Sequence, residues 1–415
     1  MRAARAGPPP RRPVPEVLVR RPPLRVVGWA ALTLVLVLVA TLLWRGSDAA
    51  ATSSTTSGQA AEPAGSPAAQ LGEAWSAASR GSGSVVAGGR VLVREDTGVR
   101  LLDPGSGTEA WHYERANARL CDATSVDGLV VAVFRTTGRC NEIVALEAGT
   151  GRRAWYRTVG FRADVRLSST DAVVLAWTPT GLATIDPSGN SIRWRFAAPG
   201  GCRIVDAAVG SAGVGVLQSC PGADAVQVRL LDGFGGEPRW SRDVTGVAVG
   251  PGAAPGTAPA AGSTPVRLAG VGPFVALLAG DTLQALAGAD GAPLSTLPLP
   301  PSRSGPADEP VELGGDDATT LVSARGTVLA LDAATGAPRW QAAATGLPAV
   351  GDPGAPDADR SVLVPEPGAF VRRDALTGAE LGRSTVSDPV APGGRTEVLG
   401  TVVVVATRSE VTAYG

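Results

Sequence analysis

Apolar residues along most of this chain fall in short runs interrupted by glycine, proline and aspartate, a pattern typical of strands joined by tight turns. The clearest stretch is TTLVSARGTVLALDAATGAPRWQAAAT at 319–345, where an apolar strand reaches a turn at Gly326 and a second strand, TVLALDA, follows. Asp332 is placed to accept hydrogen bonds from the amides of the next turn, and Gly336 can adopt positive φ there without steric cost. Trp340 then opens the following strand. The pattern predicts antiparallel strands in sequence order.

This phrase of strand, turn and tryptophan recurs along the chain. Strong copies are LDPGSGTEAW (102–111), LEAGTGRRAW (146–155), IDPSGNSIRW (185–194), LDGFGGEPRW (231–240) and LDAATGAPRW (331–340), and weaker copies are LAGADGAPLS (286–295) and RDALTGAELG (373–382). The repeat tryptophans, which we interpret as packing between neighbouring sheets, are Trp75, Trp111, Trp155, Trp194, Trp240 and Trp340. The repeat position returns at intervals of 36 to 55 residues, near the period of about 40 that is typical of a four-stranded propeller blade.

The two ends of the repeat region complement each other. The final stretch, TEVLGTVVVVATRSEVTAYG (396–415), supplies strands but no Trp strand, whereas LGEAWSAAS (71–79) is a Trp strand with no blade before it. An open ring would leave an unpaired strand edge, which invites aggregation. We therefore predict an all-β fold over residues 71–415. It is an eight-bladed β-propeller of four-stranded antiparallel blades, with seven full units and one split unit that strand 71–78 closes.

The phrase L-D-A-x-T-G-x-x-x-W, almost intact at 331–340 and degraded elsewhere, resembles the tryptophan-docking repeat of the pyrroloquinoline-quinone-type propellers. That family includes quinoprotein alcohol dehydrogenases and the propeller lipoprotein of the outer-membrane assembly machinery, and the resemblance implies eight blades. Ser295 and Gly382 stand where the other copies have Trp, so we expect blades five and seven to be looser. The motif is specific for the fold and says little about function.

A membrane anchor is predicted at the N-terminus. Residues 26–44 (VVGWAALTLVLVLVATLLW) carry no charge, and as a helix they would span about 28 Å, enough to cross a bilayer. Residues 1–25 carry seven Arg and one Glu, and such a basic tail is expected to stay in the cytoplasm. The sequence predicts a single-pass membrane protein with an extracytoplasmic propeller. The alternative is a cleaved signal peptide, because SDAAA at 47–51 offers small residues.

Residues 45–70 are almost entirely Ala, Ser, Thr, Gly and Pro. Such a segment has too little bulky apolar surface to order itself, so the sequence predicts a disordered stalk between helix and propeller. Deletion of residues 55–62 is accordingly expected to change stability little.

The four cysteines fall at matching places in two repeats. Cys121 and Cys202 each begin a first strand, and Cys140 and Cys220 each follow a second strand. Antiparallel pairing brings the members of each pair to the same end of their sheet, and an oxidising compartment favours disulfides. The sequence predicts two disulfides within blades, 121 to 140 and 202 to 220.

No residue pattern points to catalysis, a cofactor or a metal. His112 is the one histidine, so a Ser-His-Asp triad would have to rest on it, and a surface strand position is its simpler interpretation. The quinoprotein dehydrogenases hold their cofactor against a disulfide of adjacent cysteines and beside calcium, and no two cysteines here are adjacent. The acidic ectodomain also lacks the basic and aromatic stripe of a nucleic-acid-binding protein. We therefore expect neither an enzyme nor a nucleic-acid partner, and the resemblance favours the outer-membrane assembly propeller.

The expected function is a non-catalytic protein-interaction or assembly scaffold in the cell envelope, held to the membrane by residues 26–44 and binding an envelope protein whose identity is unknown. The alternative is a sensor or carrier for a small ligand, a quinone or a sugar, in the central channel. Converging polar side chains in the channel would favour a ligand, and a flat apolar patch would favour a partner. The long insertions at 247–268, 299–310 and 347–359 are rich in Pro, Ala and Gly and favour disorder, so no binding residues are assigned.

Overall fold

The computed structural model describes residues 24–61, 63–81, 83–161, 164–221, 225–245, 247–249, 264–301, 311–351 and 360–415. The chain divides into two compact units, Met1–Ala51 and Thr52–Gly415. The described part of the first unit contains α1 (Leu24–Arg45) and α2 (Asp48–Ala51). α1 includes the whole predicted span 26–44 and is long and apolar enough to cross a membrane.

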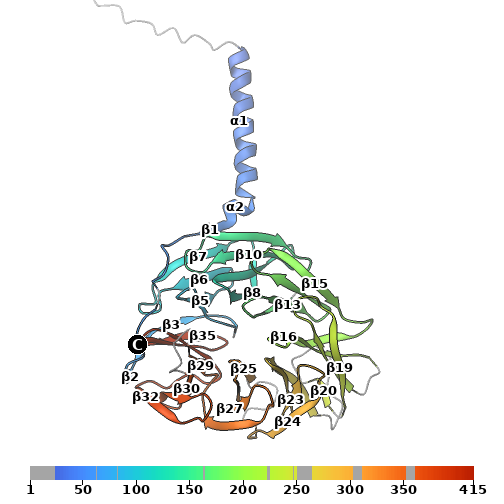
Figure 1. Ribbon diagram of the computed structural model, residues 1–415. Coiled ribbons are helices and arrows are strands. Elements are labelled where there is room, and N and C mark those ends of the chain that lie inside the picture. The colour runs from blue at the N-terminus through green and yellow to red at the C-terminus, as the bar shows by residue number, and fades with distance from the viewer. Residues whose placement is uncertain are drawn as a thin grey trace, which may run out of the picture. The chain divides into compact units, whose positions relative to one another are not determined.

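The second unit is a ring of eight β-sheets around a central opening (Figure 1). We number these sheets as blades 1 to 8 in chain order. The four strands of each blade pair antiparallel, from an inner strand beside the opening to an outer strand at the periphery. The predicted eight-bladed β-propeller is confirmed. Blades 1, 5 and 7 carry a fifth strand.

Within each blade the strands lie in order from the inner to the outer edge. Blade 1 contains β4 (Val86–Ala87), β5 (Arg90–Arg94), β6 (Gly98–Leu102), β7 (Glu109–Arg115) and β1 (Thr52–Ser54). Blade 2 contains β8 (Arg119–Val126), β9 (Leu129–Thr136), β10 (Arg139–Glu147) and β11 (Arg153–Thr158). Blade 3 contains β12 (Arg166–Ser169), β13 (Val174–Thr178), β14 (Gly181–Asp186) and β15 (Ser191–Ala197). Blade 4 contains β16 (Arg203–Gly210), β17 (Gly213–Ser219), β18 (Ala225–Leu231) and β19 (Pro238–Thr245).

The second half of the ring is built in the same way. Blade 5 contains β20 (Val247–Val249), β21 (Thr264–Val271), β22 (Phe274–Ala279), β23 (Thr282–Ala287) and β24 (Pro293–Pro298). Blade 6 contains β25 (Val311–Gly315), β26 (Thr319–Ala324), β27 (Thr327–Asp332) and β28 (Pro338–Ala343). Blade 7 contains β29 (Ala349–Val350), β30 (Ser361–Glu366), β31 (Ala369–Asp374), β32 (Glu380–Val386) and β2 (Gln70–Leu71). Blade 8 contains β33 (Arg395–Leu399), β34 (Val402–Ala406), β35 (Glu410–Tyr414) and β3 (Glu73–Ala78).

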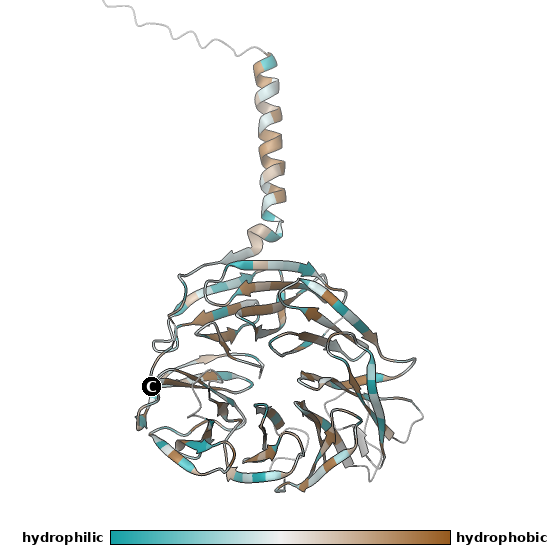
Figure 2. Ribbon diagram, in the orientation of Figure 1, coloured by the Kyte–Doolittle hydropathy of each residue, from teal (hydrophilic) through white to brown (hydrophobic). Residues whose placement is uncertain are grey.

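The core lies between blades. Leu101 of blade 1 packs in one cluster with Phe134 of blade 2, and Val228 of blade 4 packs in another with Val275 of blade 5. Figure 2 shows hydrophobic residues concentrated on the inner and middle strands and more hydrophilic residues on the outer strands. Because each cluster draws on two neighbouring sheets, the ring is stabilised by blade-to-blade contact as well as by pairing within blades.

The repeat tryptophans join successive blades. Each indole N–H donates to a main-chain carbonyl in the turn of the next blade: Trp75 to Pro104 (2.9 Å), Trp111 to Ala148 (2.9 Å), Trp155 to Pro187 (2.7 Å), Trp194 to Gly233 (3.1 Å), Trp240 to Gly288 (3.2 Å) and Trp340 to Ala375 (2.9 Å). Ser295, at the Trp position of blade 5, retains this bond through its hydroxyl, which donates to the carbonyl of Gly336 at 2.6 Å. The six tryptophans therefore both cover apolar surface and fix the next turn.

That turn explains the aspartate and glycine of the repeat. Asp332 Oδ1 accepts the amide of Thr335 at 2.8 Å, and hydrogen bonds from Arg339 and Thr335 lower the pKa of this carboxyl. In the next copy Gly378 has φ +73°, and a Cβ atom there would lie 2.6 Å from the Trp340 side chain. Only glycine fits under the docked ring, so Trp of one blade and Gly of the next form one structural unit.

The ring closes with the N-terminal Trp strand. β3 pairs antiparallel with β35, placing Trp75 opposite Ala413 and Ala77 opposite Val411. Closure therefore joins strands from the two ends of the second unit, and β3 covers an edge of β35 that would otherwise be open.

Both predicted disulfides are present. Cys121 is bonded to Cys140 with their Cα atoms 6.1 Å apart, and Cys202 is bonded to Cys220 with a Cα separation of 4.0 Å. In each pair, the first cysteine lies at the start of the blade's innermost strand. The second cysteine lies just after the blade's second strand, as the spacing predicts.

The prediction of a disordered stalk over residues 45–70 is wrong for much of that segment. β1 pairs antiparallel with β7, and beyond it the amide of Ser57 donates to the carbonyl of Thr150 at 3.0 Å. Arg90 Nη2 donates to the carbonyl of Gly58 at 3.0 Å, and β2 pairs in parallel with β32. We call residues 52–61 and 63–71 the strap. Its order comes from main-chain hydrogen bonds to strand edges and turns, which need no bulky side chains.

The three long insertions fall mainly on residues 250–263, 302–310 and 352–359, which lie outside the described residues.

Candidate functional site

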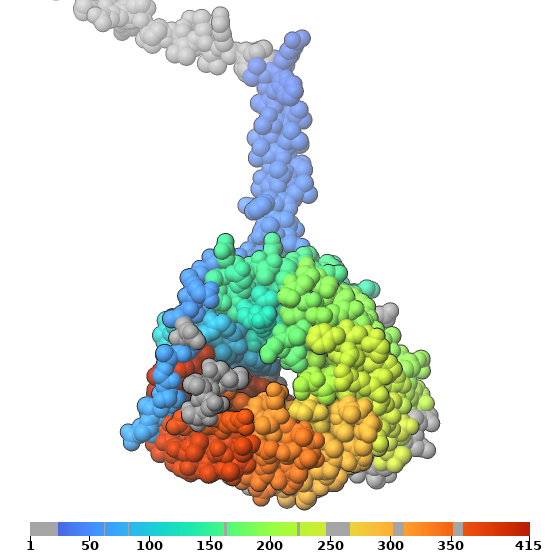
Figure 3. Space-filling model, viewed as in Figure 1, coloured from blue at the N-terminus to red at the C-terminus, as the bar shows by residue number. Residues whose placement is uncertain are grey.

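Charged side chains of both signs gather on the strands nearest the central opening. They stand on the innermost strands of their blades, apart from Arg94 on β5 and Arg267 on β21, and electrostatic interactions link several of them. We call them the inner charge ring: Arg94, Asp122, Arg166, Asp206, Arg267, Glu312, Arg395 and Glu397. The ring has as many acids as arginines and so has no net charge. Figure 3 shows the opening at the centre of the blades.

Two aspartates of the ring stand at β-bulges. The pairing register of β8 shifts just before Asp122, and that of β16 shifts just before Asp206. Bulges of this kind re-aim a side chain. Asp122 Oδ2 accepts the amide of Leu167 in blade 3 at 2.7 Å, and Asp206 accepts the amide of Leu268 in blade 5. Each carboxylate therefore connects its own inner strand to that of the following blade.

Arginines make the complementary contacts. Arg94, 2% exposed, donates from Nε to the carbonyl of Ala123 in blade 2 at 2.8 Å and from Nη2 to the carbonyl of Ser84 at 2.7 Å. Arg395 of blade 8 lies 3.4 Å from Glu312 of blade 6, measured from Nε to Oε2. This ion pair bypasses blade 7, whose inner strand β29 is only two residues long and contributes no charge.

Burial is the main influence on the protonation of these groups. It raises the pKa of Asp206 to about 6, against the opposing effect of Arg166 and Arg267. It also lowers the pKa of Arg94. Burial raises the pKa of the three other acids, Asp122, Glu312 and Glu397. The carboxylates thus depend on neighbouring arginines to remain charged in the channel wall.

His112 lies on β7, away from the charge ring. Its Nε2 is 2.9 Å from Ser53 Oγ, and its Nδ1 is 2.6 Å from Glu109 Oε1 and 3.3 Å from Thr55 Oγ1. The first two contacts have the order of a serine hydrolase triad. However, the amide of His112 also donates to Thr55 Oγ1 at 3.0 Å, and the amide of Thr55 donates to the carbonyl of His112 at 3.0 Å. We interpret this cluster as the anchor of the strap on β7.

The described residues do not fit a quinone and calcium site. Within the described ranges, no three His, Cys, Asp or Glu side chains are grouped so as to hold a metal ion. Neither disulfide joins adjacent cysteines, and each instead joins two parts of one sheet. The inner charge ring brings charges of both signs near the opening, which suits hydrogen bonding to a polar guest better than stacking of a flat quinone.

Sequence reasoning placed the tryptophans and cysteines in their structural roles but missed the charge ring. A usable signal exists, because several inner strands carry one acidic residue among apolar or small residues, as in CDATSV (121–126) and IVDAAV (204–209). Reading that signal requires knowing that these strands meet around one axis.

Comparison with known proteins follows the fold. Residues 68–173 and 279–415, more than half of the chain, match the family described as outer membrane protein assembly factor BamB. No curated protein sequence matches the chain. The computationally designed Ika8 protein is 14% identical over 84% of this chain and 99% of its own, with a TM-score of 0.51, and this likeness shows the fold alone.

Two natural proteins are similar at lower TM-scores. BamB from Moraxella catarrhalis is 16% identical over 83% of this chain and 99% of its own, with a TM-score of 0.47. The quinohemoprotein alcohol dehydrogenase ADHIIG from Pseudomonas putida HK5 is 14% identical over 83% of this chain and 76% of its own, with a TM-score of 0.44. Neither likeness bears on activity.

Proposed function

This chain belongs to the family of the outer membrane protein assembly factor BamB, and from that premise we propose that it is a non-catalytic scaffold that binds partner proteins in the cell envelope. The observation that carries the proposal is the closed ring, whose blades are joined by docked tryptophans and two of whose blades each contain a disulfide. A surface that is already ordered loses little conformational freedom when a partner binds. That preorganisation supports the scaffold role.

We place α1 in the cell membrane with the basic residues 1–25 in the cytoplasm and the propeller outside. The apolar length of α1 supports an anchor, and the arginine-rich flank supports this orientation. Protease added to intact cells without an outer barrier should remove the propeller, and complete protection would contradict the orientation. Mass spectrometry of the mature chain distinguishes an anchor, which keeps residues 24–45, from a cleaved signal peptide.

Crosslinking in intact membranes tests the scaffold role. The chain has no lysine, so amine-directed reagents reach at most its N-terminus and photoreactive groups placed on the propeller are required. The matched control is a chain limited to residues 1–51 and expressed at the same level. We expect the full chain to capture envelope proteins that the control does not. Identical captured sets would overturn the proposal.

The non-catalytic part of the proposal is tested at Ser53. Its hydroxyl contacts the one histidine of the chain, so it is the residue a serine-directed fluorophosphonate would modify if the cluster were a nucleophilic site. We expect no modification. Labelling of Ser53 that disappears in His112→Ala would show that the chain is an enzyme.

One observation favours a second function, binding of a small polar ligand in the channel. The inner charge ring provides carboxylate and guanidinium groups near the opening, and a few such polar groups are what orients a small ligand in a binding site. The charge ring favours a sugar over a quinone as that guest. Binding of a charged or neutral sugar that is lost in Asp206→Asn would support this function.

A further inference from the structure

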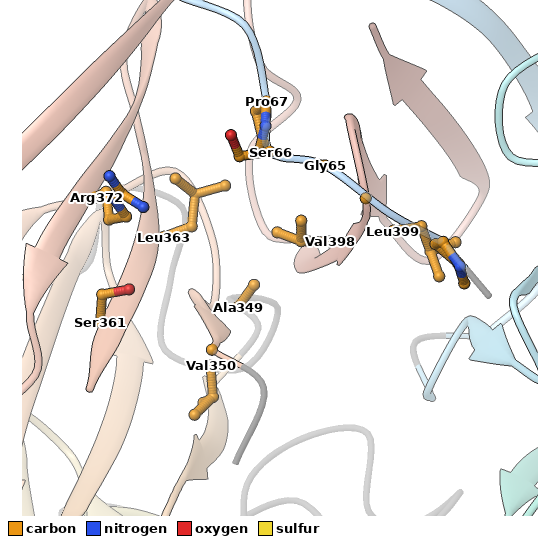
Figure 4. A pocket seen from close by; sticks show the side chains of 13 residues that line it. Gly65, Ser66, Pro67, Ala349, Val350, Ser361, Leu363, Arg372, Val398 and Leu399 are labelled. Carbon is orange, nitrogen blue, oxygen red and sulfur yellow. The ribbon is translucent and has the colours of Figure 1, made fainter. Parts of the chain in front are cut away.

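The strap leaves only a short tether between the apolar helix and the propeller. The sequence predicts a free stalk over residues 45–70, whereas in the structure the chain is bound to the ring from Thr52 onward. The strap remains attached as far as β2, which pairs with β32. Along the way Gly65, Ser66 and Pro67 line a cavity of about 450 Å³ together with Leu363 of blade 7 and Val398 of blade 8 (Figure 4). The step from Arg45 to Thr52 therefore sets the reach of the tether, at most about 25 Å when fully extended.

That tether ends at the outer edge of the ring, where blade 1 meets blade 2. Thr52 lies opposite Arg115 on β7, the outer strand of blade 1. Five residues later, the amide of Ser57 donates to the carbonyl of Thr150 in the turn of blade 2 at 3.0 Å. Figure 1 shows β1 at the periphery of the ring and β15 of blade 3 further along the same arc. A membrane anchor in α1 therefore keeps this arc within about 25 Å of the lipid surface.

The outer strands of blades 2 and 3 are the most basic in the ring. β11 and β15 carry two arginines each and no acid: Arg153, Arg157, Arg193 and Arg195. The other six outer strands, β3, β7, β19, β24, β28 and β32, together carry as many Asp and Glu residues as arginines. Because the ectodomain as a whole is acidic, this concentration of positive charge is a local feature of blades 2 and 3.

Two of the four arginines carry positive charge that no carboxylate neutralises. Arg153 and Arg195 are exposed, and neither makes an ion pair within the described ranges. Arg193 is also exposed, but its Nη2 lies 3.0 Å from Asp186 Oδ2. Arg157 is half-buried and donates to a main-chain carbonyl of blade 3. The free charge of this surface therefore rests on Arg153 and Arg195.

An exposed tyrosine lies on the same surface. All three tyrosines of the chain are among the described residues, and Tyr113 and Tyr414 are buried. Tyr156 on β11 is 46% exposed. Tyrosine is enriched at membrane interfaces, because its ring is apolar and its hydroxyl forms hydrogen bonds. We call this surface the basic rim: Arg153, Tyr156, Arg157, Arg193 and Arg195.

We propose that the basic rim binds anionic phospholipid headgroups of the membrane that holds α1. The proposal rests on the anchor proposed above. Two independent observations support it, because the short tether keeps this arc near the lipid and the charge of β11 and β15 favours this arc for contact. Guanidinium groups bind phosphates through charge-assisted, often paired hydrogen bonds. Each basic residue near an anionic surface strengthens attachment about fivefold. The ring then stands on its edge, and both of its faces stay open to envelope partners.

The test uses the full chain in lipid nanodiscs. One set contains roughly one part phosphatidylglycerol to two parts phosphatidylcholine, the other contains phosphatidylcholine alone, and both carry a trace of phosphatidylcholine with a photoreactive diazirine on its headgroup. Irradiation should crosslink residues 153–158 and 191–197, mapped by peptide mass spectrometry, at least fivefold more in the anionic discs. Salt at about 1 M, where screening acts within about 3 Å, should remove the difference. Equal crosslinking in the two kinds of disc would overturn the proposal. Retention of the chain in the discs reports the anchor separately.

Paired substitutions decide which residues are responsible. Arg153→Gln with Arg195→Gln should reduce crosslinking of the rim in anionic discs at least fivefold, because both free charges are removed. Arg153→Lys with Arg195→Lys keeps the charge and should crosslink like the wild type. The matched control is Arg383→Gln with Arg408→Gln, at exposed arginines of blades 7 and 8, which should also crosslink like the wild type.

The outcomes separate lipid from protein. The substituted rim arginines are exposed, so the variants should fold, and urea unfolding checks this. No loss in the glutamine pair, or equal losses in the rim and control pairs, would refute the proposal. Loss of an envelope protein captured in native membranes, with lipid crosslinking unchanged, would assign the basic rim to an acidic protein surface and refute the lipid contact.

Discussion

Replacing Asp206 by asparagine should make the propeller more stable, relative to the wild type, at neutral pH than in acid. Burial raises the pKa of Asp206 from 3.8 to about 6, so between these values the folded chain holds a proton that the unfolded chain has released. The stability contributed by this carboxyl therefore falls as pH rises through that window and stays low above it. A difference of about 2 pKa units corresponds to roughly 3 kcal/mol, at about 1.4 kcal/mol per unit.

Asparagine mimics the protonated carboxyl, because each offers one uncharged acceptor oxygen in the same place. That oxygen can still accept the amide of Ala207, which lies 3.0 Å from Asp206 Oδ1. If the asparagine NH2 group instead faced the amide of Leu268, two donors would meet without an acceptor. That arrangement would cost about 1 to 3 kcal/mol at every pH. The change in the difference between variant and wild type with pH, rather than its value at one pH, is therefore the quantity predicted.

The assay is urea unfolding of the full chain in detergent, followed by tryptophan fluorescence at pH 4.5 and pH 8. The free-energy advantage of Asp206→Asn should grow by roughly 2 to 3 kcal/mol between the two conditions. Asp232→Asn is the matched control, for which the difference from the wild type should barely change between the two conditions. Hydrogen bonds from Arg239 and the turn amides lower the pKa of Asp232 from 3.8, so its contribution is present at both pH values and is lost only in stronger acid. Parallel pH curves for Asp206→Asn and the wild type would refute the reasoning.

Other perturbations test the junctions of the ring. Trp111→Ala should cost about 3 to 5 kcal/mol in urea unfolding, and Trp155→Ala should cost less, because Trp111 is fully buried and Trp155 is partly exposed; equal costs would contradict docking by burial. Replacing both Cys121 and Cys140 by serine should cost about 3 kcal/mol on the chain-entropy view, and no loss under non-reducing conditions would show that the bond is not formed. Deletion of residues 55–62 should lower the thermal midpoint, since it removes the strap's bonds to blades 1 and 2; an unchanged midpoint would restore the flexible stalk.

The sequence by itself determined the parts of this protein that repeat or lie in one local stretch. The Asp and Gly of a turn act on the next few residues, and the Trp that follows recurs at a fixed place in six of the eight blades. Cys121 and Cys140 belong to one sheet, so their spacing was enough to pair them. The split blade was also readable, because the Trp strand missing at residues 396–415 is present at 71–78.

Only the tertiary structure decided the strap, the charge ring and the junction between blades 7 and 8. The strap is ordered by main-chain hydrogen bonds, which its small side chains do not reveal. Arg395 and Glu312 are 83 residues apart and become an ion pair because the inner strand between them is short. Gly382 could be seen as a missing Trp, but the reason lies in the closure of blade 8, where the two chain ends take the place of the docking turn. These features depend on which strands lie next to each other around the axis. The residues that meet there are not separated by a regular interval in the sequence, so the repeat pattern does not reveal them.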